Sequence, residues 1–222
     1  MWQADGDRTA ATQMARDEAL WRTAQEGRPA GRVYEWDEVH VTVGRNQAFT
    51  PIQVGWTRRP TGGKAVLHGH DLTIGWAVPL AAFGLSDDSR SVKAVYRAMA
   101  GPLIRALNAV GIPAELAETT RFVRNAGKVA DCFAHISPND IVNPATGQKV
   151  CGCALALGGG AALLQASVPV RRPAIDPAEL GLEGSAAWTA TGATVADLAE
   201  ALVRTTDLGP ATFLRATASD SM

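Results

Sequence analysis

The sequence predicts an α+β fold in which a central, mainly antiparallel or mixed sheet is flanked by helices. Three observations lead to this prediction. Short runs rich in β-branched and aromatic residues outnumber the helical stretches, turn residues separate consecutive runs as in hairpins, and a few longer stretches carry apolar residues at helical spacing. The composition is that of a globular protein, since 46% of the 222 residues are hydrophobic and 19% are charged.

Two helices frame the first half of the chain. Residues 10–24 place apolar groups, from Met14 to Trp21, on one side of a helix. Residues 91–110 carry the strongest helical pattern, with Gly101-Pro102 as a candidate kink. We expect the helices on one side of the sheet. The expected strands are 32–36, 39–44, 54–56, 65–67, 72–78, an edge strand and loop over 115–122, 131–135, 140–143, 149–157 and 161–170.

The last fifty residues change character, because proline, alanine and glycine become frequent. Helices are expected there at 177–182 and 195–205, the second capped by Thr194. We therefore predict one domain over 1–222, with a core of about 10–172 and a helical C-terminal extension over 173–222.

Charge and composition exclude several classes of protein. A net charge of −1 argues against nucleic-acid binding. No apolar run is long enough for a membrane helix, and the N-terminus lacks a signal-peptide pattern, so a cytoplasmic location without membrane contact is expected. Three cysteines, two of them Cys151 and Cys153, argue against a disulfide framework. His68 and His70 lack a further ligand cluster, so no metal site is expected.

The segment Arg58-Arg59-Pro60-Thr61-Gly62-Gly63-Lys64-Ala65-Val66-Leu67-His68 is a candidate ligand loop. Glycines allow backbone N–H groups to approach an anion closely, and the two arginines are suited to a phosphate. The alternative is a hairpin turn with two solvated arginines.

Lys149 and Cys132 are the candidate catalytic residues. Lys149 lies in a glycine-flanked, strand-like run and is suited to stabilising a developing oxyanion, although a surface lysine fits the pattern as well. The Cys132 thiol is a competent acyl acceptor, and a buried, inert thiol is the alternative. His135 is three residues away and would face the opposite side of a strand, so a local Cys–His pair is not expected.

Several blocks of the sequence, taken in order, resemble the lipoate-protein ligase A/octanoyltransferase family of the biotin/lipoate protein ligase superfamily. These blocks are 14–20 (MARDEAL), 43–47 (VGRNQ), 58–68 (RRPTGGKAVLH), 139–141 (NDI) and 147–154 (GQKVCGCA). The resemblance implies the catalytic domain of a protein acyltransferase, in which Lys149 orients the acyl carbonyl. It also implies a set of substrate-binding residues, namely Arg58, Arg59, Thr61, Gly62, Gly63, Ala65, His68, Asn139, Asp140, Gly152 and Ala154.

Two activities are consistent with this resemblance. An octanoyltransferase would move octanoate from acyl carrier protein to a lysine of a lipoyl-carrier domain through a Cys132 thioester, without a cofactor. Cys132-Phe133 resembles the nucleophile segment of that branch. The alternative is an ATP- and Mg²⁺-dependent ligase acting through lipoyl-adenylate, which Asn139-Asp140-Ile141 favours. The second alternative is a non-catalytic binder of lipoate or of a lipoylated protein, because the stretch 157–160 lacks the usual basic residues.

Overall fold

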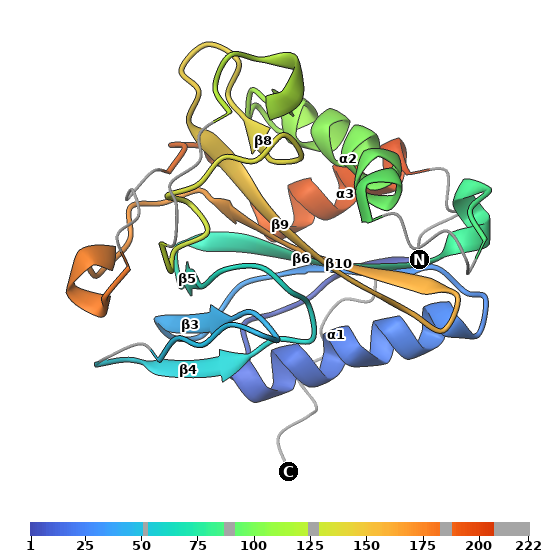
Figure 1. The fold of residues 1–222 in the computed structure, drawn as a ribbon, viewed down its shortest axis with the longest axis horizontal. Coiled ribbons are helices and arrows are strands. Elements are labelled where there is room, and N and C mark those ends of the chain that lie inside the picture. The colour runs from blue at the N-terminus through green and yellow to red at the C-terminus, as the bar shows by residue number, and fades with distance from the viewer. Residues whose placement is uncertain (51–52, 87–91, 124–128, 183–187, 207–222) are drawn as a thin grey trace.

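The computed structural model describes residues 1–50, 53–86, 92–123, 129–182 and 188–206. Its main element is a seven-stranded mixed sheet with the strand order β1-β2-β6-β10-β9-β8-β7 (Figure 1). The strands are β1 (Trp2–Ala4), β2 (Ala30–Tyr34), β6 (Asp71–Pro79), β7 (Glu115–Leu116), β8 (Ile141–Val142), β9 (Lys149–Gly158) and β10 (Ala161–Pro169). All neighbours are antiparallel except β1 and β2, so the expected mainly antiparallel or mixed sheet is confirmed.

A smaller sheet of three strands lies beside the large one. Its order is β4-β3-β5, and its strands are β3 (His40–Val43), β4 (Gly55–Arg58) and β5 (Val66–His68). β3 pairs with β4 in parallel and with β5 in antiparallel orientation. The hydrogen bond from Thr61 Oγ1 to Gln165 Oε1 of β10 (2.6 Å) and the contact of His68 Nδ1 of β5 with Asp71 Oδ2 of β6 (2.9 Å) link this part of the chain to the large sheet.

The helices cover both faces of the large sheet, so the expectation that they lie on one side is wrong (Figure 1). α2 (Val92–Ala109) and α3 (Val195–Thr205) share a core with Ile74, Trp76 and Leu164. α1 (Ala10–Gln25) packs on the opposite face, against Ala77 and Leu163. β6 and β10 carry buried apolar residues on both faces of the sheet. A strand that is buried on both faces needs other elements packed against each of them.

Most predicted elements are present, with shifts of one or two residues at their ends. The expected 177–182 helix is a short 3-10 turn, η3 (Pro177–Leu180), and two similar turns are η1 (Leu80–Phe83) and η2 (Ala117–Thr119). Thr194 caps α3 as expected and forms a reciprocal box with Asp197. β1 was not predicted, because three residues carry too little pattern to recognise a strand.

The expected strand at 131–135 is wrong. The chain makes one isolated bridge, between Ala65 and Asp131, and then turns. The Asp131 side chain accepts a hydrogen bond from the Phe133 backbone N–H at 2.8 Å, and such a local bond favours a turn over a strand ladder. This turn has a consequence for the site, because it directs the carbonyl groups of Cys132 and His135 to one point.

Candidate functional site

A cavity lies between the small sheet and the large one. Its lining comes from both sheets and from α1, and its open space, with the solvent at its mouth included, is about 340 Å³. The lining residues are Met14, Tyr34, Trp36, Thr42, Arg59, Val66, His68, Thr73, Cys132, Gly152, Cys153, Ala154, Gln165, Ala166 and Ser167. Many of these are polar, but their polar atoms bond to one another, which leaves a mainly apolar surface suited to a hydrocarbon chain.

Cys132 is held in the cavity wall by the ligand loop predicted from the sequence. Its backbone N–H donates to the carbonyl of Ala65 at 2.9 Å, and the Ala65 N–H donates to the carbonyl of Ala130 at 2.9 Å. Its sulfur lies against Gly152 of β9, where an added Cβ would be 3.3 Å from Cys132 Sγ and 3.2 Å from Phe133 Cζ. A glycine at this position is therefore what allows the thiol to approach the strand.

Lys149, at the start of β9, contacts Cys132 and is not part of the cavity lining. Its ammonium is 3.4 Å from Cys132 Sγ and 2.9 Å from Asp140 Oδ1, and it donates to the carbonyls of Cys132 (2.9 Å) and His135 (3.2 Å). A register shift between β8 and β9 pairs Val142 with Lys149 and Ile141 with Cys151, so the intervening residue is a bulge. This bulge breaks the alternation of the strand and brings Lys149 to the same side as Gly152.

The charges of this pair are set by burial and by each other. Burial raises the pKa of the Cys132 thiol above its ordinary value, and the positive charge of Lys149 offsets only part of this effect. For Lys149, burial would lower the pKa, but Cys132, when it is a thiolate, and the charge of Asp140, together with the hydrogen bonds to both, raise the pKa above its ordinary value. The resting site therefore holds a protonated lysine beside a neutral thiol.

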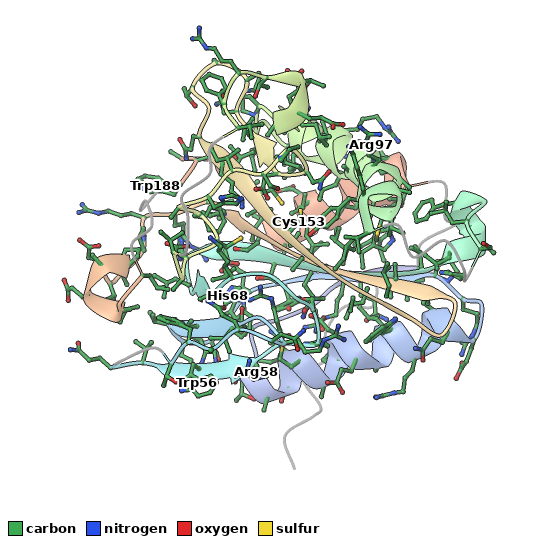
Figure 2. All side chains as sticks on the ribbon, viewed as in Figure 1. Trp56, Arg58, His68, Arg97, Cys153 and Trp188 are labelled. Atoms are coloured by element: carbon green, nitrogen blue, oxygen red, sulfur yellow. The ribbon has the colours of Figure 1, made fainter. Side chains whose placement is uncertain are left out.

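The two arginines of the ligand loop have structural roles. Arg59 is buried and donates five hydrogen bonds to protein atoms, including the carbonyls of Gly62 and Lys64 at 2.7 Å each. Arg58 Nη1 donates to the backbone carbonyls of Gly44, Arg45 and Gln47. Figure 2 shows Arg58 beside Trp56 on the outer strand of the small sheet, away from the cavity. The glycine turn contacts β9, since the Gly62 N–H donates to the carbonyl of Leu155 at 3.3 Å.

His68 is a hydrogen-bonded part of the cavity wall. Its Nδ1 is 2.9 Å from Asp71 Oδ2, its Nε2 is 2.8 Å from Thr42 Oγ1, and its ring stacks on Trp36 with centroids 4.1 Å apart. Asp71 is fully buried and also accepts hydrogen bonds from Thr73 and Ser167. These bonds link four strands of the wall, β3, β5, β6 and β10. Among the described residues there is no group of three or more His, Cys, Asp or Glu that could hold a metal ion.

The predicted site residues divide into two groups. Arg59, His68, Cys132, Gly152 and Ala154 line the cavity. The others are not among the lining residues, and they are Arg58, Thr61, Gly62, Gly63, Ala65, Asn139, Asp140 and Lys149.

Sequence reasoning missed several lining residues, among them Tyr34, Thr73, Gln165 and Ser167. Gln165 and Ser167 carried a signal, because they are polar residues two apart in an otherwise apolar strand. A shared polar face inside a buried strand indicates a cavity or a polar network on that side.

Comparison with known proteins places these features in one family. Residues 9–181 match the model of the lipoyl protein ligase A/B catalytic domain. The chain belongs to the lipoyl protein ligase A/B family. Octanoyltransferase LipM of Exiguobacterium sp. is 31% identical over 175 residues, covering 72% of this chain and 62% of that protein. The enzyme of the same name from Kyrpidia tusciae is 31% identical over 177 residues, covering 73% and 63%. The chain thus spans less than two thirds of the length of these relatives.

Solved structures of lipoate protein ligases share the fold. A lipoate-protein ligase A bound with ATP superposes with a TM-score of 0.65 and 24% identity, covering 92% of this chain and 82% of that one. A bipartite lipoate protein ligase from Thermoplasma acidophilum, described with its E2 lipoyl domain, gives a TM-score of 0.62 and 21% identity, covering 92% and 80%. The predicted α+β class and the predicted family are therefore confirmed. A search of the described helices found none with the length and apolar character that spanning a bilayer requires.

Proposed function

We propose that this chain is an octanoyltransferase domain, which moves an octanoyl group from acyl carrier protein to a lysine of a lipoyl-carrier domain through a thioester on Cys132. One observation carries the proposal: the Cys132 thiol lines an apolar cavity, with the Lys149 ammonium 3.4 Å from its sulfur. The LipM relatives, whose name is octanoyltransferase, support the same activity.

The first half of the reaction loads the cysteine. The Cys132 sulfur attacks the thioester carbon of the donor, a new S–C bond forms, and the donor S–C bond breaks. The carrier leaves as a thiolate and takes up the proton that Cys132 loses. The Lys149 ammonium favours the anionic form of the sulfur during this attack, because opposite charges at this distance attract strongly in a buried site.

The second half transfers the group to the acceptor. The neutral amine of the acceptor lysine attacks the Cys132 thioester, an amide N–C bond forms, and the S–C bond breaks. The amine proton returns to the Cys132 sulfur, which restores the thiol. Shielding of the thioester in the cavity protects it from water between the two halves.

The alternative is a ligase that uses ATP and Mg²⁺, and the ATP-bound structural relative is the reason to keep it. The arginines of the loop argue against it here. The five hydrogen bonds that Arg59 donates go to protein atoms, and Arg58 is directed to backbone carbonyls, so neither is free to bind a phosphate. This arrangement supports a donor that arrives already activated as a thioester.

The test compares two donors on one lipoyl-domain acceptor. We expect octanoyl-carrier protein to support transfer without ATP and in the presence of EDTA, with an octanoyl adduct on Cys132 visible by intact mass when the acceptor is left out. Cys132→Ser should lose the thioester adduct, whereas Cys151→Ser, a buried thiol outside the cavity lining, should keep it. Transfer that requires free lipoate and ATP would establish the ligase instead. If the chain binds octanoate or lipoate but transfers neither group from any donor, the remaining function is that of a non-catalytic binder.

A further inference from the structure

Lys149 carries one positive charge that two neighbouring groups compete for. Asp140 Oδ1 lies 2.9 Å from its ammonium and Cys132 Sγ lies at 3.4 Å, with the carbonyls of Cys132 and His135 at 2.9 and 3.2 Å. An ammonium has three N–H donors, so it cannot serve four acceptors at full strength. Among the four acceptors, the Asp140 carboxylate lies as close as 2.9 Å and carries a full charge, whereas the Cys132 sulfur lies farthest away, at 3.4 Å.

Asp140 is itself held in place. Its carboxylate accepts a hydrogen bond from the Ser137 backbone N–H at 2.6 Å, and its own N–H donates to the Ser137 carbonyl at 3.1 Å. Its carbonyl accepts from the Ala117 N–H at 2.8 Å, which ties this turn to η2. Asp140 is 6% exposed, so its attraction for Lys149 is weakly screened by water.

We propose that Asp140 is a positioning residue that shares the Lys149 ammonium with Cys132 and thereby keeps the resting sulfur in its thiol form. This inference rests on the proposed function, since it assigns Cys132 the part of the nucleophile. Asp140 acts in two ways at once. It anchors the cation beside the sulfur, and its negative charge opposes the formation of a second anion there.

The other charged groups around the sulfur balance one another. Lys149 and Arg59 favour the thiolate, whereas Asp140 and Asp131 disfavour it. Tyr96, which also interacts electrostatically with Cys132, has a pKa raised well above its ordinary value by burial and by neighbouring groups, so it is neutral. Removing one negative charge should therefore tilt the balance toward the thiolate, provided that the lysine stays in place.

Asp140→Asn makes this change with little change of shape. The asparagine loses the charge and keeps one oxygen, which can accept from Lys149, while its NH2 group takes the place of the oxygen that accepts from the Ser137 N–H. We expect the pH midpoint of Cys132 alkylation by iodoacetamide, followed residue by residue with mass spectrometry, to fall by about one unit. Alkylation at pH 7 should then be about ten times faster, because the thiolate is the reacting form.

Two further variants make the result decisive. Asp140→Glu restores the charge and should return the midpoint toward that of the parent chain, which a purely structural role would not predict. Asp7→Asn removes an exposed carboxylate elsewhere and should leave the midpoint unchanged. A midpoint that stays or rises in Asp140→Asn, in a variant whose thermal unfolding remains cooperative, overturns the proposal. The proposal is also overturned if Asp140→Asn no longer folds and Asp140→Glu does not return the midpoint of alkylation to that of the parent chain.

The alkylation assay needs no acyl donor, so it separates this inference from the proposed function. A shifted midpoint without any octanoyl adduct on Cys132 would contradict the transferase and leave the charge sharing intact. An adduct that forms normally, together with an unshifted midpoint in Asp140→Asn, would contradict only the role of Asp140.

Discussion

Single buried side chains decide the chemistry and much of the rigidity of this site. Asp71 illustrates this, because one carboxylate receives hydrogen bonds from His68, Thr73 and Ser167 while it is fully buried. Burial alone would raise its pKa, but the charge of His68 and the hydrogen bonds from His68 and Ser167 lower it far below its ordinary value. A carboxylate whose pKa is lowered by folding stabilises the fold chiefly in its ionised form.

Replacing Asp71 should therefore cost stability in a pH-dependent way. At pH 7, Asp71→Asn is expected to lower the free energy of unfolding by about 3 kcal/mol, because the histidine and both hydroxyl groups lose a charged acceptor. The folded pKa is the lower one, so the advantage of the parent chain is complete above about pH 4. Below that pH it should shrink by up to about 1.4 kcal/mol per pH unit. Urea denaturation between pH 7 and pH 3 measures this, and a difference independent of pH would contradict it.

At the scale of elements, the site depends on two irregularities. The bulge in β9 turns Lys149 toward the thiol, and the turn at 131–135 directs two carbonyls to the same ammonium. β9 also provides Gly152, the point at which the strand comes closest to Cys132. Neither irregularity was predicted, since the sequence pattern indicates regular strands over both 131–135 and 149–157.

Filling the gap at Gly152 should harm reactivity more than stability. The new methyl group of Gly152→Ala would lie 3.2 to 3.3 Å from Phe133 and Cys132, a separation that requires neighbours to move by a few tenths of an ångström. We expect the rate of octanoyl transfer to fall by about tenfold or more, because small displacements of a nucleophile are costly. The matched control is Gly6→Ala, where nothing lies within 4 Å. Equal rates in both variants, measured as adduct formation on Cys132, would show that the close approach is unimportant.

At the scale of the whole molecule, the cavity lies where the small sheet and the large sheet come together, since residues of both line it. Thr61 and Gln165 bond across the gap at 2.6 Å, and Gln165 continues the network to Asp17 of α1, also at 2.6 Å. Asp17 in turn pairs with the buried Arg32 at 2.8 Å. This polar network satisfies the lining groups internally, so the space that remains is open to an apolar ligand.

A ligand that fills this space should stabilise the entire fold. With octanoic acid at about 100 times its Kd, the midpoint of thermal unfolding is expected to rise by about 5 °C, because only the folded state binds. Ala154→Leu places a larger side chain in the cavity wall and should reduce the rise. Ala196→Leu, at an exposed position of α3, should leave the rise unchanged. A rise of equal size in both variants would mean that the acid binds elsewhere.

Much of the fold was predictable because it depends on local patterns. The helices α1, α2 and α3 and the long strands β6, β9 and β10 follow from apolar periodicity that extends over nine or more residues. The placement of helices on both faces was not predicted, since helical spacing shows that a helix has an apolar side but not which sheet face it covers. The division into a core and a C-terminal extension stays a prediction.

The sequence by itself determined the fold class, the family and the two residues on which the chemistry is proposed to depend. Those follow from residue types and their order along the chain, which a pattern of five motifs is long enough to specify. Only the tertiary structure decided that the Lys149 ammonium lies 3.4 Å from the Cys132 sulfur, that the two arginines donate to protein atoms, and that Asp140 contacts the same ammonium. These relations join residues that are distant in sequence. Burial and competition for hydrogen bonds set them, and both exist only once the chain has folded.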